Sequence, residues 1–247
     1  MDKTFQKLID KIVDIGDSII HQKIKVLANN NKDIKINLDV EINQQLVEYL
    51  ENKFTFPILS EENITRKSFN DYDELVWIID PLDGSLNFSR NIPINCISIA
   101  LWGRGTFQFS CIYDFNRKEL FTTENKTCLL NNEICQTSNL TKPENGVLCT
   151  GFPSWRNYED ESLKAFLCKI QNWKKIRAIG SAALSLAWVA RGWADAYIEE
   201  DIHIWDVAAG MALVNVAGGD IYLKENDRPT FVTAIATNGK IPIKELL

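Results

Sequence analysis

Hydrophobic residues recur at helical spacing along the first fifty positions of the chain. In residues 5–27 the apolar side chains fall three or four positions apart, and residues 38–54 repeat this pattern. A period close to 3.6 residues is typical of an amphipathic helix that buries one face. The sequence therefore predicts two helices, joined by the polar stretch Asn29-Asn30-Asn31-Lys32-Asp33, which we expect to form a mobile loop.

From residue 56 the pattern changes to short runs rich in β-branched and aromatic residues. These runs predict strands at residues 56–59, 76–79, 96–102, 107–113, 119–123 and 127–130. Several are joined by short turns, which favours an antiparallel sheet. After Pro143 strands alternate with predicted helices at 159–170, 182–191 and 207–216. We predict a mixed α/β protein with two sheet layers, built as two fused halves, residues 1–143 and 144–247.

Composition and charge narrow the class of protein. The 247 residues are 45% hydrophobic and 24% charged, as in ordinary soluble globular proteins. The net charge of -6, without a block of Lys or Arg, argues against nucleic acid as a partner. No apolar run approaches the roughly 20 residues of a membrane span, and the start of the chain lacks a hydrophobic signal core, so we expect a cytoplasmic protein that binds no membrane. The six cysteines lack C-x-x-C spacing and are expected to be reduced.

One turn in the chain combines two carboxylates with groups that can bind an anion. Pro81 cannot donate to a sheet ladder, so the strand before it is expected to stop at Asp80. Asp83 can turn back toward the same point, while Gly84 lets the backbone approach a ligand and Ser85 adds a hydroxyl. Oxygen ligands without nearby Cys or His favour Mg²⁺ or Mn²⁺ over Zn²⁺. An ordinary β-turn stays open as an alternative.

Other acidic residues stand at the ends of predicted elements. Glu61 and Glu62 follow the strand at 56–59, and their side chains would approach Asp80 if the two strands are neighbours. Two adjacent glutamates on a solvated surface are the alternative. Asp206 precedes a small apolar helix, where it could be a plain N-cap or could use its second oxygen to bind metal.

These motifs resemble those of the inositol monophosphatase family, the magnesium-dependent, lithium-sensitive phosphatases related to fructose-1,6-bisphosphatase and 3'-phosphoadenosine phosphatases. Residues 77–88 resemble the first signature of the family, and residues 205–219 resemble the second. Supporting matches lie at residues 60–62, 150–153, 180–183, 195–199 and 236–240. The resemblance implies a layered α-β-α-β-α sandwich and a homodimer.

The resemblance also implies a set of metal ligands. Glu61, Asp80 and the carbonyl of Leu82 would hold the first Mg²⁺. Asp80, Asp83 and Asp206 would hold the second. One ion would activate a water and the other would stabilise the leaving alkoxide during in-line attack. Mn²⁺ could substitute, and Li⁺ would inhibit.

Further roles follow from the same resemblance. Glu61 and Ser85, with Asp80, would form the catalytic set that orients and deprotonates the water, and the N–H groups of Gly84 and Ser85 would bind phosphate. Glu199 would reach a hydroxyl of the substrate. The remaining substrate contacts implied by the resemblance are Asp83, Gly180, Ser181, Ala182 and Asp206. Glu62 would support this site rather than bind metal.

Two departures from the family pattern affect this assignment. Ser85 stands where the family usually has Thr, so the hydroxyl is kept but its rotamer is less fixed. The usual Thr-x-x-Asp segment is Ile36-Asn37-Leu38-Asp39 here, which removes a hydroxyl near the position of a third, weaker metal. Lys32 and Asp39 therefore stay only secondary candidates, and the third ion and lithium sensitivity stay open.

Several functions and substrates compete with the first choice. We expect a small sugar or polyol phosphate, with inositol 1-phosphate first, while fructose 1,6-bisphosphate, 3'(2'),5'-bisphosphate nucleotides and histidinol phosphate stay open. A non-catalytic regulatory binding protein is the alternative from another class. Cys111 and Arg117 fit the C-x5-R spacing of cysteine phosphatases, but the segment between them contains Asp114 and no glycine to cradle an anion. His21 is expected at the surface, and His203 is expected to flank the pocket.

Overall fold

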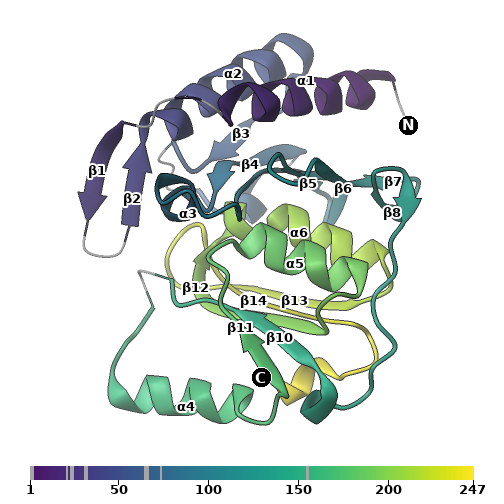
Figure 1. Cartoon of the computed structure of the whole chain (residues 1–247). Helices are drawn as coiled ribbons and strands as arrows, with labels where there is room; N and C mark the ends of the chain where they lie inside the picture. The colour runs from purple at the N-terminus through teal and green to yellow at the C-terminus, as the bar shows by residue number, and fades with distance from the viewer. Residues whose placement is uncertain are drawn as a thin grey trace.

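The computed structural model describes residues 3–20, 22, 25–30, 33–63, 67–72, 74–153 and 156–247. Figure 1 shows five layers stacked from top to bottom: two helices, a sheet, two helices, a second sheet and a last helix. This is the α-β-α-β-α sandwich that the resemblance implied. No helix in these ranges is both long and apolar enough to cross a membrane.

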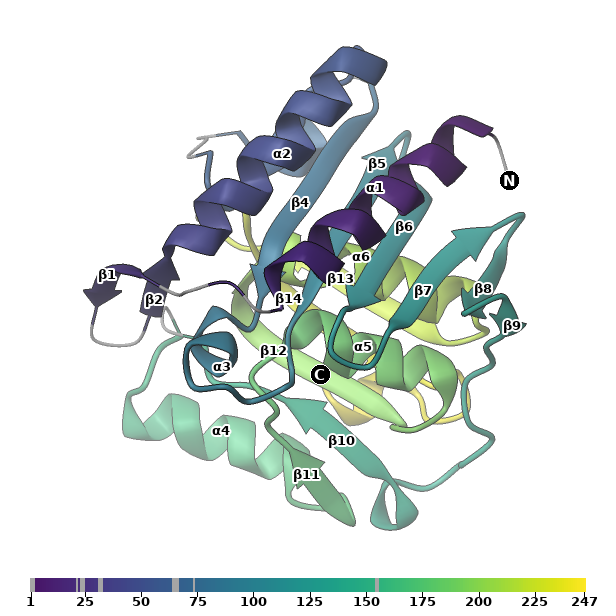
Figure 2. The ribbon, with the colours of Figure 1, turned by 45° about the horizontal axis from the view of Figure 1, so that its top comes forward.

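The first layer consists of α1 (Lys3–Ile19) and α2 (Asn37–Lys53), which lie side by side across the large sheet (Figure 2). Both helices bury an apolar stripe against the sheet. The predicted first helix was too long, because Val26–Asn30 forms strand β1, which pairs with β2 (Asp33–Ile36). Apolar spacing alone cannot distinguish these states, and the pairing partner decides. The predicted loop is therefore partly a hairpin, while His21 and Lys32 lie outside the described residues.

The large sheet has seven strands in the order β3-β4-β5-β6-β7-β8-β9. Their bounds are Ile58–Ser60, Val76–Asp83, Cys96–Gly103, Thr106–Asp114, Glu119–Glu124, Thr127–Leu130 and Glu133–Ile134. The pairs from β4 to β9 are antiparallel, as predicted, whereas β3 and β4 are parallel. The six predicted strands are confirmed. The two-residue strand β9 was missed because it is too short to show a pattern.

Strand β4 does not stop before Pro81, and this prediction was wrong. The strand continues to Asp83 with a shift in register, since Asp80 lies opposite Ser98 while Asp83 lies opposite Cys96. One extra residue on β4 therefore forms a bulge that contains Pro81. A bulge accommodates proline because it leaves one residue without its ladder hydrogen bond. The bulge, rather than a strand end, sets the direction of the two aspartates.

The second sheet has five strands in the order β11-β10-β12-β14-β13. Their bounds in this order are Lys175–Arg177, Val147–Thr150, Ala196–His203, Phe231–Thr237 and Asp220–Glu225. Strand β10 is parallel to both of its neighbours, and the other two pairs are antiparallel. The remaining helices are α3 (Ser85–Ser89), α4 (Asp160–Ile170), α5 (Ala182–Arg191), α6 (Ile204–Val216) and the 3-10 turns η1 (Phe69–Asp71), η2 (Pro143–Asn145) and η3 (Ile243–Glu245).

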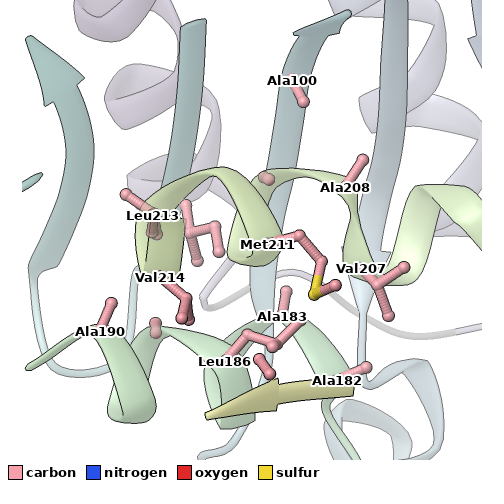
Figure 3. Packing of buried hydrophobic residues seen from close by; sticks show 14 of the residues in the cluster. Ala100, Ala182, Ala183, Leu186, Ala190, Val207, Ala208, Met211, Leu213 and Val214 are labelled. Atoms are coloured by element: carbon pink, nitrogen blue, oxygen red, sulfur yellow. The ribbon is translucent and has the colours of Figure 1, made fainter. Parts of the chain in front are cut away.

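Helices α5 and α6 form the central layer, and almost all of their side chains are buried. Figure 3 shows Leu186 and Ala183 of α5 facing Met211 and Val214 of α6. The two helices approach closely because Gly210 has no side chain: a Cβ there would lie 2.4 Å from the Cβ of Leu186. Close packing of this kind resists displacement. The central pair therefore provides a rigid base for the helix starts that carry polar groups.

Candidate active site

Glu61 is placed beside Asp80 by the parallel pairing of β3 and β4. Ser60 lies opposite Ile79 in this register, and the backbone N–H of Glu61 donates to the Ile79 carbonyl oxygen at 3.3 Å. The conditional prediction that these two strands are neighbours is thus confirmed. Glu61 itself is exposed, whereas Asp80 is only 2% exposed.

The β4 bulge presents Asp80 and Asp83 from the same short segment. The Oδ1 atom of Asp80 accepts a hydrogen bond from the Leu82 N–H at 3.0 Å. Asp83 faces the start of α5, where its Oδ2 atom accepts from the Ser181 hydroxyl and from the Ala183 N–H at 2.9 Å. Asp83 therefore joins the first signature to residues that the sequence assigned to the substrate pocket, with the Ser181 hydroxyl engaged by this carboxylate.

The segment before α5 is also held from the first half of the chain. The side-chain amide of Asn87 donates to the carbonyl oxygens of Ile179 at 2.8 Å and Ile94 at 2.9 Å. Gly180 packs against this amide, since a Cβ there would lie 3.0 Å from Nδ2 of Asn87. Asn87 positions the pocket segment, a role that its place in the signature did not reveal.

Asp206 lies inside the first turn of α6 rather than before the helix, so the predicted helix start at residue 207 was wrong. His203 is the N-cap, and its backbone N–H donates to the Asp206 carboxylate. The imidazole of His203 stacks on the Trp205 ring, with 4.2 Å between the ring centroids. Burial lowers the pKa of His203 to about 4. A neutral ring in this stack supports the helix start that carries Asp206.

The carboxylates at this point act on one another electrostatically. Burial raises the pKa of Asp80 well above its usual value, and the charges of Glu61, Asp83 and Asp206 raise it further. Burial likewise raises the pKa of Asp206, with contributions from Glu61 and Asp83, and raises that of Asp83 to about 6. A buried group of like charges is unfavourable unless a cation compensates it. We call Glu61, Asp80, Asp83 and Asp206 the acidic cluster.

The donor chemistry of the acidic cluster fits magnesium. Its potential ligands are oxygens, which hard divalent cations prefer. Across the described ranges, no three His, Cys, Asp or Glu side chains are arranged as a ready-made metal site. Mg²⁺ does not require a closed cage of protein ligands, because it usually keeps several waters.

Ser85 connects the acidic cluster to the helical layer above it. Its hydroxyl lies 2.6 Å from Oδ1 of Asp39 and 2.9 Å from the Leu82 carbonyl oxygen. The second oxygen of Asp39 accepts from the Ile36 N–H at 2.7 Å, and burial raises the pKa of Asp39 to about 6. Asp39, kept only as a secondary candidate, therefore contacts the catalytic turn through Ser85.

Gly84 is required at its position in this turn. Its φ of 88° lies in the left-handed region, and a Cβ would lie 2.7 Å from the Ile94 carbonyl oxygen. Both constraints favour glycine over any other residue. The turn can therefore bring its backbone N–H groups toward a ligand, as the sequence predicted.

Glu62 lies partly buried beside the β1–β2 hairpin. Its carboxylate forms an ion pair with Lys35 of β2. This arrangement agrees with a supporting role for Glu62. Lys35 was missed, because a single lysine in a polar hairpin carries no recognisable signal.

Glu199 lies on β12, apart from the residues of the first signature. It is 7% exposed, and burial raises its pKa to about 8. The Tyr197 phenol and the Arg156 guanidinium oppose this shift by stabilising the anion. Neither partner was predicted. Tyr197 stands two positions before Glu199 on β12, so the two side chains lie on the same face of the strand, and this spacing could have revealed Tyr197.

The cysteine-phosphatase alternative has no support in the structure. Cys111 is buried in β6, and burial raises the pKa of its thiol, so the reactive thiolate is disfavoured. Arg117 is paired with Asp114, with 2.6 Å between Nη1 and Oδ2. The C-x5-R spacing is therefore a coincidence. All six cysteines are free thiols, and five of them are buried.

Comparison with known proteins identifies the family. The profile described as "Inositol monophosphatase family" matches residues 2–237. The chain is 36% identical over 201 residues to the protein named Nus factor SuhB of Xylella fastidiosa, covering 80% of this chain and 72% of that protein. It is 29% identical over 230 residues to the inositol monophosphatase of Dictyostelium discoideum, covering 89% and 84%. The structure of Thermotoga maritima IMPase is 26% identical, with a TM-score of 0.80 over 99% of this chain and 94% of that one. The chain therefore belongs to the inositol monophosphatase family.

Proposed function

We propose that this protein is a Mg²⁺-dependent phosphomonoesterase that hydrolyses a small sugar or polyol phosphate, with inositol 1-phosphate as the first candidate. The observation that carries the proposal is the acidic cluster at the β4 bulge, beside the Gly84-Ser85 turn, in which Asp80 and Asp83 are buried. The family is generally metal-dependent, which supports the same reading.

The acidic cluster supplies the oxygens for two ions. Glu61, Asp80 and the Leu82 carbonyl would hold one, while Asp80, Asp83 and Asp206 would hold the other. When bound, Mg²⁺ supplies positive charge to the phosphoryl and leaving oxygens and lowers the pKa of a water. Asp80 would serve both positions, so its loss should be the most damaging.

The chain's own groups prepare the attack on phosphate. Glu61 would accept the proton of the attacking water, with Ser85 orienting it. Asp39 accepts a hydrogen bond from the Ser85 hydroxyl, which fixes the rotamer that a β-methyl would otherwise restrain. The N–H groups of Gly84 and Ser85 would bind the phosphate oxygens as their negative charge grows.

The far side of the substrate would meet the second half of the chain. Glu199 would accept a hydrogen bond from a substrate hydroxyl, and Gly180, Ser181 and Ala182 would line the pocket. The resemblance to the Dictyostelium inositol monophosphatase supports a polyol phosphate. Fructose 1,6-bisphosphate, 3'(2'),5'-bisphosphate nucleotides and histidinol phosphate are the alternative substrates.

A second candidate function is favoured by the names of several relatives. The protein named Nus factor SuhB of Xylella fastidiosa is 36% identical to this chain, so a related factor role is a separate possibility. Such a role does not need the acidic cluster. Asp80→Asn would therefore leave a factor role intact while removing phosphatase activity.

The test is a phosphate-release assay with Mg²⁺ and with EDTA. The panel contains inositol 1-phosphate, fructose 1,6-bisphosphate, histidinol phosphate and 3'-phosphoadenosine 5'-phosphate, with p-nitrophenyl phosphate as a generic substrate. We expect turnover that requires Mg²⁺, is highest on inositol 1-phosphate and is lost in Asp80→Asn. Absence of turnover on every substrate would overturn the proposal.

A further inference from the structure

Gly151 follows the last residue of β10 and lies next to Glu199 on the parallel strand β12. In the pairing of β10 with β12, Thr150 lies opposite Ile198, and the Thr150 hydroxyl donates to the Ile198 carbonyl oxygen at 2.6 Å. The next residues along the chain are Gly151 and Glu199. Side chains at neighbouring positions of paired strands lie close together, so the two positions compete for the same space.

The carboxylate of Glu199 occupies the space where a side chain at position 151 would stand. A Cβ on Gly151 would lie 2.3 Å from Oε1, 2.7 Å from Cδ and 2.9 Å from Oε2 of Glu199. The φ angle of Gly151 does not lie in the left-handed region, so the backbone does not require glycine there. Glycine at this position is thus explained by the close approach of Glu199, and a methyl group would have to displace the carboxylate.

Two further groups act on the charge of the Glu199 carboxylate. The Arg156 guanidinium stabilises its negative charge, and the Tyr197 hydroxyl lies beside it. The Arg156 side chain is 1% exposed, and its Nη1 lies 2.8 Å from Oε2 of Glu200. A buried cation fixed in this way gives Glu199 a defined charge environment.

The segment that begins with Gly151 is anchored on α4. Phe152 packs edge to face on the Phe166 ring with 5.6 Å between centroids. The Arg156 guanidinium lies over the same ring at 4.1 Å. Phe152 and Arg156 therefore contact the same aromatic ring of α4.

We propose that Gly151 is a specificity-determining residue: the missing side chain lets the Glu199 carboxylate fold over the end of β10, where it recognises a hydroxyl of the substrate. This inference rests on the proposed function, in which Glu199 accepts that hydroxyl. Gly151 acts through Glu199 and contacts neither phosphate nor the acidic cluster. Its substitution should therefore change the choice of substrate and not the cleavage of phosphate esters in general.

The test compares kcat and KM of Gly151→Ala and wild type on two substrates with Mg²⁺. Inositol 1-phosphate carries ring hydroxyls, whereas p-nitrophenyl phosphate has none. We expect kcat/KM for inositol 1-phosphate to fall about tenfold or more, the loss of one hydrogen bond to a charged group. The kcat/KM for p-nitrophenyl phosphate should stay within about twofold. Equal losses on both substrates would overturn the inference.

A double-mutant cycle with Glu199→Ala tests whether the effect passes through the carboxylate. We expect the ratio of kcat/KM for inositol 1-phosphate to kcat/KM for p-nitrophenyl phosphate to be the same in the double variant Gly151→Ala/Glu199→Ala as in Glu199→Ala alone. Fully additive losses would contradict the mechanism.

Phe152→Ala is the matched control, because it removes an anchor of the same segment without adding an atom near Glu199. We expect it to leave the ratio of the two kcat/KM values unchanged, and an equal change in that ratio would assign the effect to loop disorder. If wild type hydrolyses neither substrate, the proposed function fails and the inference fails with it. Turnover by wild type with no selective loss in Gly151→Ala overturns the inference alone.

Discussion

Two buried acidic regions of this protein differ in what compensates their charge. In the acidic cluster, the charges that act on Asp80 among the described residues are the carboxylates of Glu61, Asp83 and Asp206. Glu199, on β12, lies instead beside the Arg156 guanidinium and the Tyr197 phenol. Like charges therefore add to the raised pKa of Asp80 in the first region, whereas a guanidinium opposes the rise in the pKa of Glu199 in the second.

This difference separates chemistry from recognition. A group of carboxylates without an internal counterion is costly to fold, and binding of a divalent cation repays that cost. Burial raises the pKa of the single carboxylate of Glu199 to about 8, although Tyr197 and Arg156 oppose the shift. Its oxygens can still serve as a fixed hydrogen-bonding group. In the proposed function, the two signatures of the sequence would build the reacting end of the pocket, while β10 and β12 would build the selective end.

The largest expected effect comes from Asp80→Asn. Because Asp80 would serve both ions, turnover should fall by about 1,000-fold or more, and Mg²⁺ binding measured by titration calorimetry should weaken. Circular dichroism should show an intact fold.

Glu199→Gln is the matched control in the other region and should keep the Mg²⁺ affinity of wild type. The distinction between the two regions would fail if Asp80→Asn kept the Mg²⁺ affinity of wild type. It would also fail if Glu199→Gln weakened Mg²⁺ binding as much as Asp80→Asn does.

Glu61→Gln should lower kcat by about 10²- to 10⁴-fold, as expected for loss of a general base. A change confined to KM would show that Glu61 only binds substrate. Steady-state kinetics at saturating Mg²⁺ separate the two cases.

The pH dependence of folding should reveal the like-charge repulsion within the acidic cluster. The folded-state pKa of Asp83 is raised to about 6, above that of an unfolded aspartate, so the folded state binds more protons between these values. Stability of the metal-free protein is therefore highest below the unfolded pKa and falls as the pH rises through about 6. Thermal unfolding in EDTA should show a lower Tm at pH 7 than at pH 5.

Mg²⁺ should reduce the dependence of Tm on pH, because it compensates the charge of the carboxylates. Asp83→Asn should reduce this dependence without metal. A metal-free Tm that rises between pH 5 and pH 7 in wild type would contradict this account of the acidic cluster.

The smallest expected effect comes from Ser85→Thr. Thr keeps the hydroxyl and adds a β-methyl that restricts χ1, while Asp39 already fixes the Ser85 hydroxyl by a hydrogen bond of 2.6 Å. We expect kcat to stay within about threefold of wild type, since the change affects only rotamer freedom. Ser85→Ala, which removes the hydroxyl, should lose much more activity. Equal activity of Ser85→Ala and wild type would remove Ser85 from the mechanism.

The sequence predicted several strands and one central helix closely. The strands from residue 96 to 130 and the helix at 182–191 were placed within one residue or two of their observed ends. The predictions failed where tertiary contacts override local pattern: the start of β1 was read as helix, and β4 was ended at Asp80, before Pro81. Pairing partners and a bulge decided these places, and neither is written in the local spacing.

The sequence by itself determined the family, the acidic residues and the turn at Gly84, because motif identity and backbone conformation are local properties. Only the tertiary structure decided which groups meet. It placed Asp83 on the start of α5, Asp39 on Ser85, and Glu199 in the space left by Gly151. Each contact joins residues at least 46 positions apart in the chain, so it depends on layer packing and strand register. Local sequence pattern carries no information on either, which is why these partners could not be predicted.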